Sequence, residues 1–400
     1  MRITTNMSFD RSIKYMQNTN TRLDQASKQY NTGLKFDTAA EDPTGMGNKL
    51  RLEAEISTYT QYSVNAGLAQ DSLGLEETSL SSMYEILGSV KVEMQSAVNG
   101  TLDNYNFEAI ATSLEESLNL LFDLTNTKTA DGEYIFSGNQ SLQPTMVKQS
   151  DGTFKCQADS GFRQVKVAPS VKVTTSDSGL GIFEQCQLCR TASSDAASTI
   201  SYKDNEQFNK FVNDYYQNGG NNDFTVSVAT DGKYELKSLR DNTVLQSGTL
   251  GDSKTITFNG MEIKMNGDYT QGALNSTIKL DKPKNDNFLN SISRVIDVLR
   301  DDNVSHAEKM SMLASGQVNI EYAKENVNVA LGHVGGRLTN IEDVINSNST
   351  LSEIKTQAKA NISEVDVYEA TENLLKQQTA LNFAQQTFSK VNGTTLFDYI

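Results

Sequence analysis

The sequence predicts an elongated α+β protein, in which both ends of the chain form long helical coiled-coil and rod domains and a β-rich outer domain is inserted between them. Two observations indicate this class. None of the four prolines falls within residues 44–143 or 284–400, so both stretches are free to form continuous helices. Between residues 131 and 280, short β-type runs alternate with Asp-Gly and Asn-Gly turns, which are typical of hairpins.

Helices are predicted before residue 131 from the spacing of apolar side chains. The first helix contains a heptad seam that steps by three and four residues, and a break follows between Gly33 and Gly45. A second helix is expected from about residue 50 to 99, and a third from about 106 to 126. The seam of the first helix occupies positions 13, 16, 20, 23, 27, 30 and 34.

The middle of the chain is predicted to contain short strands and one short helix, at about residues 205–216. The turn Asn259-Gly260 lies between two alternating runs and is the clearest hairpin signal in the sequence. The expected strands are 133–136, 164–167, 171–175, 224–229, 234–239, 255–258, 262–265 and 277–280.

Helix is predicted again from about residue 285 to 392, ending at Gly393. Capping boxes at Ser305–Glu308 and Thr350–Glu353 predict two helix restarts, and the glycines within residues 331–336 predict a bend. The last helix carries a second seam at positions 367, 370, 374, 377, 381, 384, 388 and 391.

Three domains follow from this order of elements. We expect a terminal coiled-coil domain from residues 1–40 and 350–400, and an α-helical rod domain from residues 41–140 and 284–349. Residues 141–283 are expected to form the β-rich outer domain.

Composition disfavours several classes of function. The formal net charge of −15 disfavours a general attraction to nucleic acid or to anionic membranes. No apolar run approaches the ~18 residues that a membrane-spanning helix needs. The first residues, Met1–Met7, carry no apolar signal-peptide core, so we expect either a cytoplasmic protein or export by a route that reads another signal.

Few residues suggest catalysis or metal binding. Cys186 and Cys189 form a C-x-x-C motif, but Cys156 and two distant histidines do not complete a four-ligand zinc site, so we interpret these cysteines as small, partly buried residues. The segment His306–Glu308 lacks the second helical histidine of zinc hydrolases, and no predicted strand precedes the glycines around His333. We therefore expect no catalytic site, no metal and no cofactor, and a protein that is not an enzyme.

The two terminal seams allow two interpretations. They are either ordinary amphipathic helices packed on the protein's own core, or assembly surfaces that pair antiparallel with each other and then with other subunits. Their place at the two ends favours assembly, because neither helix could stay folded alone. The apolar members of the N-terminal assembly seam are Ile13, Met16, Leu23, Tyr30 and Leu34. Those of the C-terminal assembly seam are Val367, Ala370, Leu374, Leu381, Ala384, Phe388, Val391, Leu396 and Phe397.

Several segments resemble the bacterial flagellin family, and within it the hook-associated proteins of the hook–filament junction. Residues 1–7 (MRITTNM), 32–35 (TGLK) and 41–45 (EDPTG) are similar to N-terminal segments of the family. Residues 131–138 (DGEYIFSG) and the ending from Gln377 to Ile400 resemble the junction proteins rather than filament flagellins. The resemblance covers nearly the whole chain and is weakest in the middle.

The resemblance implies a structural junction protein of the bacterial flagellum, which joins the hook and the first hook-associated protein to the flagellin filament. Its partners would be other copies of the chain in a ring, hook-associated protein 1 and flagellin, with no nucleic acid and no membrane. The terminal segments would be disordered in the free subunit and would pair inside the axial tube after incorporation.

The resemblance also implies an extracellular location in the flagellum, reached through the flagellar type III export apparatus without a signal peptide. A cytosolic export chaperone would bind the last helix at Leu374, Leu375, Leu381 and Phe388. Three alternatives remain open: a filament flagellin subunit, an enzyme carried in the β insert, and a cytosolic coiled-coil scaffold whose termini are ordered in the free chain.

Overall fold

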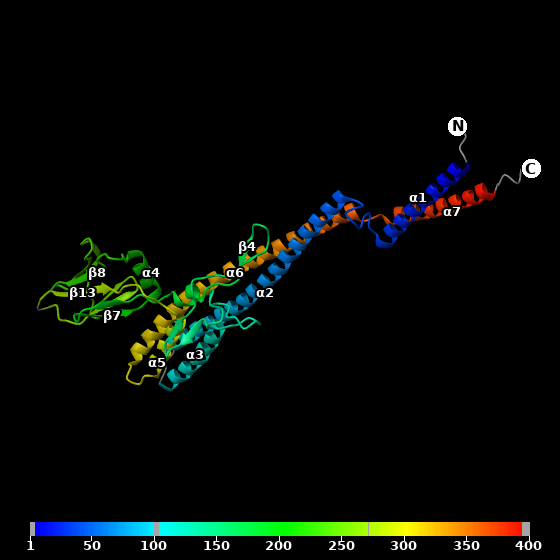
Figure 1. The fold of residues 1–400 in the computed structure, drawn as a ribbon. Helices are drawn as coiled ribbons and strands as arrows, with labels where there is room; N and C mark the ends of the chain where they lie inside the picture. The colour runs from blue at the N-terminus through cyan, green and yellow to red at the C-terminus, as the bar shows by residue number, and fades with distance from the viewer. Residues whose placement is uncertain (1–4, 100–103, 271, 394–400) are drawn as a thin grey trace, which may run out of the picture. The chain divides into compact units, whose positions relative to one another are not determined.

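The computed structural model describes residues 5–99, 104–270 and 272–393, and it confirms the α+β class (Figure 1). Long helices come from both ends of the chain, and strands come between Met146 and Asp286. The order of helix, sheet and helix therefore agrees with the order that the sequence predicts.

Contacts divide the chain into two compact units. The second unit comprises Leu68–Val165 and Lys172–Ile341, and the first comprises Lys166–Val171 and the described residues before and after the second. The helices α2 (Pro43–Asn99) and α6 (His306–Ser363) each supply residues to both units. Helix α6 runs without a break through the predicted boundary between residues 349 and 350, and the three-domain division stays a prediction.

Two predicted interruptions of α6 are wrong. The helix continues through residues 331–336 despite their glycines, and it also continues through Thr350. The hydroxyl of Thr350 donates to the carbonyl of Asn346 at 2.9 Å, a bond of a mid-helix threonine and not of a cap. A glycine costs a helix only about 1 kcal/mol relative to alanine, so the burial of neighbours such as Val334 and Ile341 outweighs it.

The capping box at Ser305 is confirmed, and α6 begins directly after it. The backbone N–H of Ser305 donates to Oε2 of Glu308 at 3.0 Å, and the N–H of Glu308 donates to Oγ of Ser305 at 3.3 Å. The hydrogen bonds from the backbone and the hydroxyl of Ser305 lower the pKa of Glu308. Sequence alone therefore located this helix start.

We expect Ser305→Ala to lower the free energy of unfolding by about 1 kcal/mol, because it removes the acceptor for an N–H of the first turn. Thr350→Ala is the matched control: its hydroxyl bonds within the helix, so its effect should stay within about 0.5 kcal/mol. Urea denaturation followed by far-ultraviolet circular dichroism measures both. Equal losses in the two variants would contradict the assignment of Ser305 as the cap.

Helices α3 (Asn104–Thr125) and α5 (Phe288–Arg300) pack together in the second unit. Arg300 pairs with Glu108 at 3.2 Å and with Glu115 at 2.9 Å, but these exposed ion pairs add little. Each large apolar side chain that the two helices bury contributes about 1.5–3 kcal/mol, so burial holds the pair together. The buried apolar residues of the pair include Leu114, Leu118, Leu121, Ile292, Val295 and Leu299.

Short ribbons and turns occupy residues 126–187. The strand expected at 133–136 is not formed: Tyr134 makes one bridge with Lys128, and the residues around it form turns. A π-helical turn, η1, spans Leu180–Glu184. The ribbons are β1 (Met146–Lys148) with β2 (Phe154–Cys156), β3 (Gln164–Lys166) with β4 (Lys172–Thr174), and β5 (Cys186–Gln187) with β14 (Asn285–Asp286).

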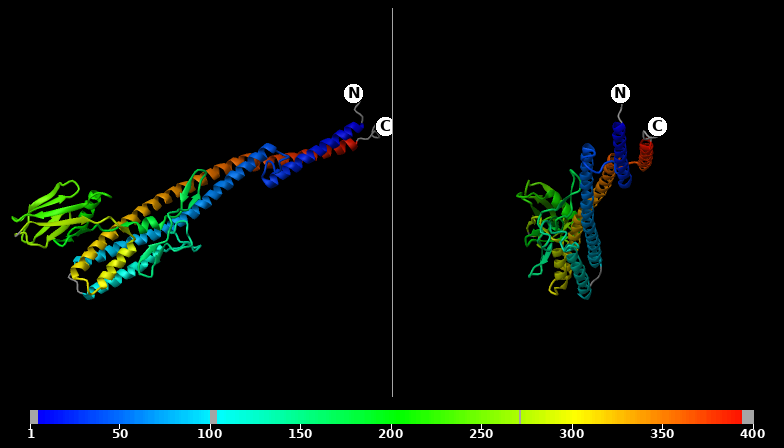
Figure 2. Two further views of the ribbon diagram at one scale, coloured as in Figure 1. Left: turned by 60° about the vertical axis from the view of Figure 1, so that its left-hand side comes forward. Right: turned by 45° about the vertical axis from the view of Figure 1, so that its right-hand side comes forward.

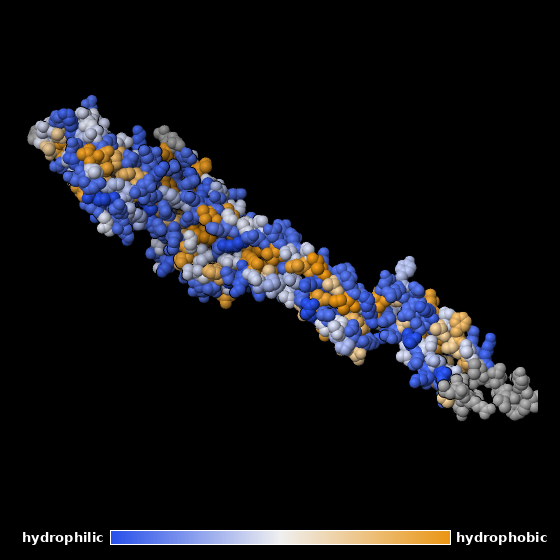
Figure 3. Space-filling model, turned by 90° about the horizontal axis from the view of Figure 1, so that it is seen from above, coloured by the Kyte–Doolittle hydropathy of each residue, from blue (hydrophilic) through white to orange (hydrophobic). Residues whose placement is uncertain are grey.

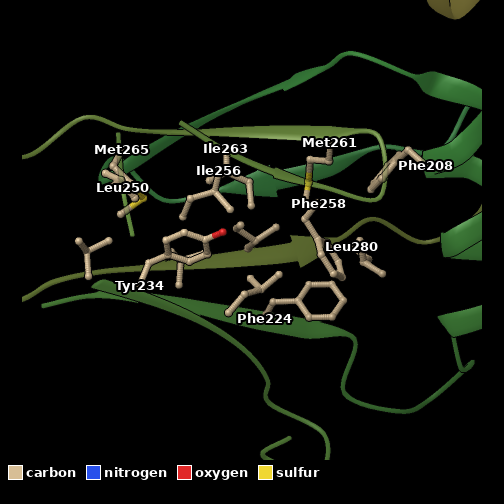
Figure 4. Close-up of a cluster of buried hydrophobic side chains, with 14 of the residues drawn as sticks. Phe208, Phe224, Tyr234, Leu250, Ile256, Phe258, Met261, Ile263, Met265 and Leu280 are labelled. Atoms are coloured by element: carbon tan, nitrogen blue, oxygen red, sulfur yellow. The ribbon is translucent and has the colours of Figure 1, made fainter. Parts of the chain in front are cut away.

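Two antiparallel sheets enclose a single apolar core in the β-rich part of the second unit (Figure 4). The larger sheet has the order β10-β9-β8-β13-β6, and the smaller has the order β11-β12-β7. In β8, Phe224, Val226 and Val228 are buried, and the residues between them are half-buried. The bounds are β6 (Ala192–Ser194), β7 (Ser198–Tyr202), β8 (Asp223–Val228), β9 (Lys233–Ser238), β10 (Val244–Thr249), β11 (Thr255–Phe258), β12 (Met261–Met265), β13 (Leu274–Leu280) and helix α4 (Asn205–Tyr215).

The predicted hairpin at Asn259-Gly260 is confirmed. Phe258 pairs with Met261, and the backbone φ angles of Asn259 and Gly260 are 44° and 80°. Two successive left-handed residues are characteristic of the type I′ turn, which suits the twist of the flanking strands. The carbonyl of Gly260 also accepts hydrogen bonds from the N–H groups just before α4, so the turn holds the start of that helix.

Candidate functional site: the paired terminal helices

Helices α1 (Thr5–Thr32) and α7 (Val367–Gly393) lie side by side and antiparallel within the first unit (Figure 2). Near one end of the pair, the rings of Phe9 and Phe388 lie 5.4 Å apart between centroids. Near the other end, Leu34 forms an antiparallel bridge with Glu364. The two terminal segments, more than three hundred residues apart in sequence, are therefore in register along the length of both helices.

The structure brings most residues of the two assembly seams together at this contact. On α1, Ile13, Met16 and Leu23 are half-buried, whereas Tyr30 is 46% exposed. Leu34 lies beyond the end of α1 at Thr32, because Gly33 ends the helix, so the prediction that it is helical is wrong. The N-terminal assembly seam is therefore less well covered towards the end of α1.

The C-terminal assembly seam follows the same pattern. Ala370 is buried, but Val367 is 69% exposed at the first position of the helix, so the pair does not cover this seam residue. Half-buried seam residues are Leu374, Leu381, Ala384 and Phe388. The side chain of Val391 and the residues Leu396 and Phe397 lie outside the described part of the structure.

Sequence reasoning missed two residues of this contact. Ala26 is only 2% exposed, the lowest value among the side chains that the structure describes in α1. The ring of Phe9 packs at a tilt against that of Phe388, although the seam was expected to begin at Ile13. Both could have been found by extending the same three-and-four spacing: Phe9 lies four residues before Ile13, and Ala26 lies three after Leu23.

A second apolar row on α7 faces away from α1. Tyr368 is 90% exposed, Leu375 58% and Phe383 64%. Spacings of seven and eight residues place these side chains along one side of the helix. Figure 3 shows apolar residues gathered in separate patches on an otherwise polar surface. The helix pair therefore covers one side of α7 and leaves another apolar side open.

A tight corner after α1 sets the register of the pair. The N–H of Gly33 donates to the carbonyl of Gln29 at 2.9 Å, and its φ of 69° ends the helix in a left-handed conformation. The N–H of Lys35 donates to the carbonyl of Ser363 at 2.8 Å, and the N–H of Val365 donates to the carbonyl of Gly33 at 2.9 Å. Residues 32–35 thus fix the chain against the segment just before α7.

The segment 41–45 forms the other half of the corner. Oδ1 of Asp42 accepts a hydrogen bond from the N–H of Gly45 at 2.8 Å in the first turn of α2. A Cβ at Gly45 would lie 2.2 Å from Oδ2 of Asp42 and 2.7 Å from the ring of Phe36, so the position has no room for a side chain. Residues 32–35 and 41–45 therefore together build the corner that positions the terminal helices.

Charged side chains support the corner at its surface. Glu41 accepts hydrogen bonds from Nζ of Lys28 and from the N–H of Asp37, each at 2.8 Å. The hydrogen bond between Glu41 and Lys28 raises the pKa of the lysine and lowers that of the carboxyl group. Both groups are solvent-exposed, so the pair orients the corner and adds little stability.

The start of α7 lies at Asp366 and not at the predicted restart near Thr350. Oδ1 of Asp366 accepts hydrogen bonds from the N–H of Tyr368 at 2.8 Å and, more weakly, from the N–H of Glu369 at 3.4 Å. Aspartate followed three residues later by glutamate is itself a cap signal. The sequence therefore contained the correct cap signal at Asp366 as well as the misleading one at Thr350.

Residues with other possible chemistry belong to the second unit. The three cysteines are free thiols, and burial raises the pKa of Cys156 to about 11 and of Cys186 to about 12. His306 is the first residue of α6, and His333 lies within that helix. Among the residues that the structure describes, no three His, Cys, Asp or Glu side chains are grouped to hold a metal ion. No helix in the described ranges is long and apolar enough to span a membrane.

Comparison with known proteins shows which proteins the chain is similar to. Residues 3–141 match the family model described as the bacterial flagellin N-terminal helical region. Flagellar hook-associated protein 3 of Escherichia coli (strain K12) is 24% identical over 173 residues, which cover 43% of this chain and 54% of that protein. Over this part of its length the chain is similar to flagellar hook-associated protein 3. The same protein of Salmonella typhimurium is 26% identical over 138 residues, covering 34% of this chain and 44% of the relative.

These sequence matches span about half the length of the hook-associated proteins 3. Solved structures extend the likeness in fold. FlgL of Xanthomonas campestris has 20% identity and a TM-score of 0.58, covering 78% of this chain and 99% of its own. Hook-associated protein 3 of Legionella pneumophila has 20% identity and a TM-score of 0.60, and the match covers 78% of this chain and 98% of the Legionella chain. The resemblance stated from the sequence motifs is confirmed.

Proposed function

We propose that the chain is a non-enzymatic structural protein that joins the hook, through hook-associated protein 1, to the flagellin filament. The observation that carries the proposal is the antiparallel pair of terminal helices, which leaves Tyr368, Leu375 and Phe383 exposed in a row. The hook-associated protein 3 names of the relatives support the same position in the flagellum.

Assembly would cover the apolar side that the pair leaves open. Each large apolar side chain transferred from water into a contact contributes about 1.5–3 kcal/mol, so a few such residues per subunit stabilise a ring appreciably. Contacts repeated around an axis are heterologous, since one face of a subunit meets a different face of its neighbour. The outer row of α7 and the exposed Tyr15 of α1 supply two different faces for such contacts.

We assign the terminal coil (residues 1–40 and 350–400) to the inside of the axial tube and residues 141–283 to the outside. Residues 41–140 and 284–349 would form the rod between them. Leu396 and Phe397 would then be covered by neighbouring subunits. This assignment gives the apolar chain ends a buried place in the assembly.

Export would use the same face of α7 as the helix pair. Leu374, Leu381 and Phe388, three of the four proposed chaperone-binding residues, are half-buried in the described pair, whereas Leu375 is 58% exposed. A chaperone groove that takes an amphipathic helix would therefore compete with α1 for these side chains. In this proposal, α1 and α7 separate in the cytosol so that α7 can bind the chaperone. The chain then passes through the type III apparatus, and the two helices pair again on assembly.

Deletion of the gene in its host tests the junction role. We expect cells with hooks but no filaments, and flagellin released into the medium, because the adaptor between two lattices is missing. Electron microscopy of the cell surface and immunoblotting of the medium for flagellin measure both. Loss of the main filament protein from the medium would instead identify the chain as the flagellin subunit, and intact filaments would contradict both roles.

Limited proteolysis of the purified chain tests the scaffold alternative. The junction proposal expects rapid cleavage within both terminal segments, because the pair opens in the free subunit. If the chain were a cytosolic scaffold, its termini would be protected from the protease. A full-length chain mixed with an excess of chaperone provides the control, since binding should protect α7 and leave α1 sensitive.

A further inference from the structure

Glu76 places a carboxyl group in the interior of the second unit. Its side chain lies on α2 and is 1% exposed. Oε1 accepts a hydrogen bond from the backbone N–H of Asp177 at 3.1 Å. Within the described residues, Oε2 is buried and has no hydrogen-bond partner. A buried acceptor without a partner costs about 1–3 kcal/mol, and more when it is charged, so this atom needs an explanation.

The charges around Glu76 come from three other segments. Asp177 precedes η1 and pairs with Nη2 of Arg337 on α6 at 2.8 Å. Arg163, just before β3, is occupied by Glu133. In the part of the chain that the structure describes, Nη1 of Arg337 is also buried without a partner. A buried acceptor and a buried donor therefore both lack partners, and both belong to side chains that contact Asp177.

A pocket of about 350 Å³ opens beside the Asp177–Arg337 ion pair. Its lining includes Asp177 and Arg337, with Ser178 and His333 next to them. The pocket is large enough to hold water. It gives protons access to the Asp177–Arg337 ion pair, and it gives the guanidinium group of Arg337 space to turn.

Physical chemistry favours a neutral Glu76 in this arrangement. Burial raises the pKa of Glu76 to about 8, and the negative charge of Asp177 adds to the rise. The N–H of Asp177 and the positive charges of Arg337 and Arg163 oppose the rise without cancelling it. A carboxyl group that loses its proton there would draw a nearby cation, because a buried unpaired charge is costly.

We propose that Glu76 is a proton-dependent switch that holds its proton in the folded chain at neutral pH and, on losing it, draws Arg337 away from Asp177. The proton passes to solvent, and the ion pair of Arg337 moves from the carboxylate of Asp177 to that of Glu76. The consequence is mechanical: in the protonated state α6 is tied to the segment before η1, and in the ionised state it is tied to α2.

The sign of the linked stability follows from the direction of the pKa shift. The folded chain binds more protons than the unfolded chain between pH 4.5, the ordinary value for a glutamate, and about 8. The free energy of unfolding that Glu76 contributes is therefore fully present below pH 4.5 and is lost as pH rises through about 8. This dependence is opposite to that of an ordinary surface carboxylate paired with a cation.

Carbon-13 NMR of the full chain, labelled at glutamate carboxyl groups and arginine side chains, tests the switch. The Glu76 signal is assigned by its loss in Glu76→Gln, and Glu77→Gln serves as the matched control because Glu77 is the exposed neighbour. We expect the Glu76 carboxyl to titrate with a midpoint near pH 8. The Arg337 guanidinium signal should shift with the same midpoint in the wild type and in Glu77→Gln, and should stay constant in Glu76→Gln.

Two results would overturn the proposal. One is a Glu76 carboxyl that titrates in the ordinary glutamate range. The other is an Arg337 signal that does not follow the Glu76 titration. Should Glu76→Gln fail to fold, Asp177→Asn replaces it: removing one carboxylate should lower the midpoint of Glu76 and hold Arg337 on Glu76. The test reads only the chain's own side chains, so its outcome is independent of the flagellar role.

Discussion

Cells that carry Ala26→Asp should be non-motile and lack filaments, as in the gene deletion. Ala26 is 2% exposed within the helix pair, so the aspartate would place a carboxylate in the contact between α1 and α7. An unpaired buried charge costs about 3 kcal/mol or more, which is a large fraction of what a few half-buried seam residues supply. The pair is therefore expected to separate instead of accommodating the charge.

Gln25→Asp provides the matched control. Gln25 is the exposed neighbour of Ala26 on the same helix, so it receives the same charge without entering the contact. We expect normal filaments and normal swimming in this variant. Motility in soft agar and electron microscopy of the cell surface measure the difference between the two strains.

Two further measurements separate failed assembly from failed export or folding. Immunoblotting of the medium should find the Ala26→Asp protein outside the cell, because Ala26 is not part of the proposed chaperone-binding face on α7. Circular dichroism should show that the second unit keeps its structure. Filaments on Ala26→Asp cells would contradict the role of the helix pair in assembly.

Gly260→Ala should lower the free energy of unfolding of the β-rich part by about 3 kcal/mol. A left-handed conformation costs a residue with a Cβ roughly 1–2 kcal/mol, and the φ of Gly260 is 80°. The added Cβ would also lie 2.2 Å from the carbonyl oxygen of Asp204 and 3.0 Å from the backbone N of Phe208. Backbone atoms cannot turn away as a flexible side chain can, so α4 must move off the hairpin.

The movement matters because α4 contributes to the core. Phe208 is fully buried among the residues between the two sheets, and Asp204 caps the helix by accepting from the N–H of Gln207 at 2.9 Å. Displacing the first turn of α4 therefore disturbs the cap and the packing of Phe208 together. We expect the loss to exceed the conformational strain alone.

Gly219→Ala isolates the strain from the clash. Gly219 has nearly the same φ, 81°, but no described atom would lie within 4 Å of its Cβ. We expect a loss of about 1 kcal/mol in this variant. Hydrogen exchange of the β8 amides, followed by mass spectrometry on the full chain, measures both. Equal exchange rates in the two alanine variants would mean that the contact with Asp204 does not constrain the turn.

Local chemistry explains why much of the fold could be predicted. Apolar spacing and the lack of proline indicate the long helices, because residues three and four apart lie on the same side of a helix. The turn Asn259-Gly260 and the cap at Ser305 were also found, since each depends on side chains within a few residues of one another. The same reasoning missed the short strands β1, β2, β5, β6 and β14, and also the longer strands β7 and β10. In β10, buried and exposed residues do not alternate, so the strand lacks the pattern on which the prediction depends.

The candidate site was predicted in outline and corrected in detail. Spacing indicated which sides of α1 and α7 are apolar, but Tyr30 and Val367 remain exposed because the two helices do not cover each other fully at that end. Ala26 was missed because an alanine carries little hydrophobic signal, although its side chain is buried. The place where α7 begins was missed because two cap signals compete, and only packing decides between them.

What the sequence by itself determined is the α+β class, the order of helical and β-rich regions, the hairpin turn, the start of α6 and a resemblance to hook-associated proteins. Tertiary structure alone decided that α6 runs through its glycines, that Phe9 meets Phe388 and that Glu76 is buried beside Asp177. The physical reason is range: periodicity, caps and turns act between near neighbours, whereas burial depends on segments brought together from distant parts of the chain.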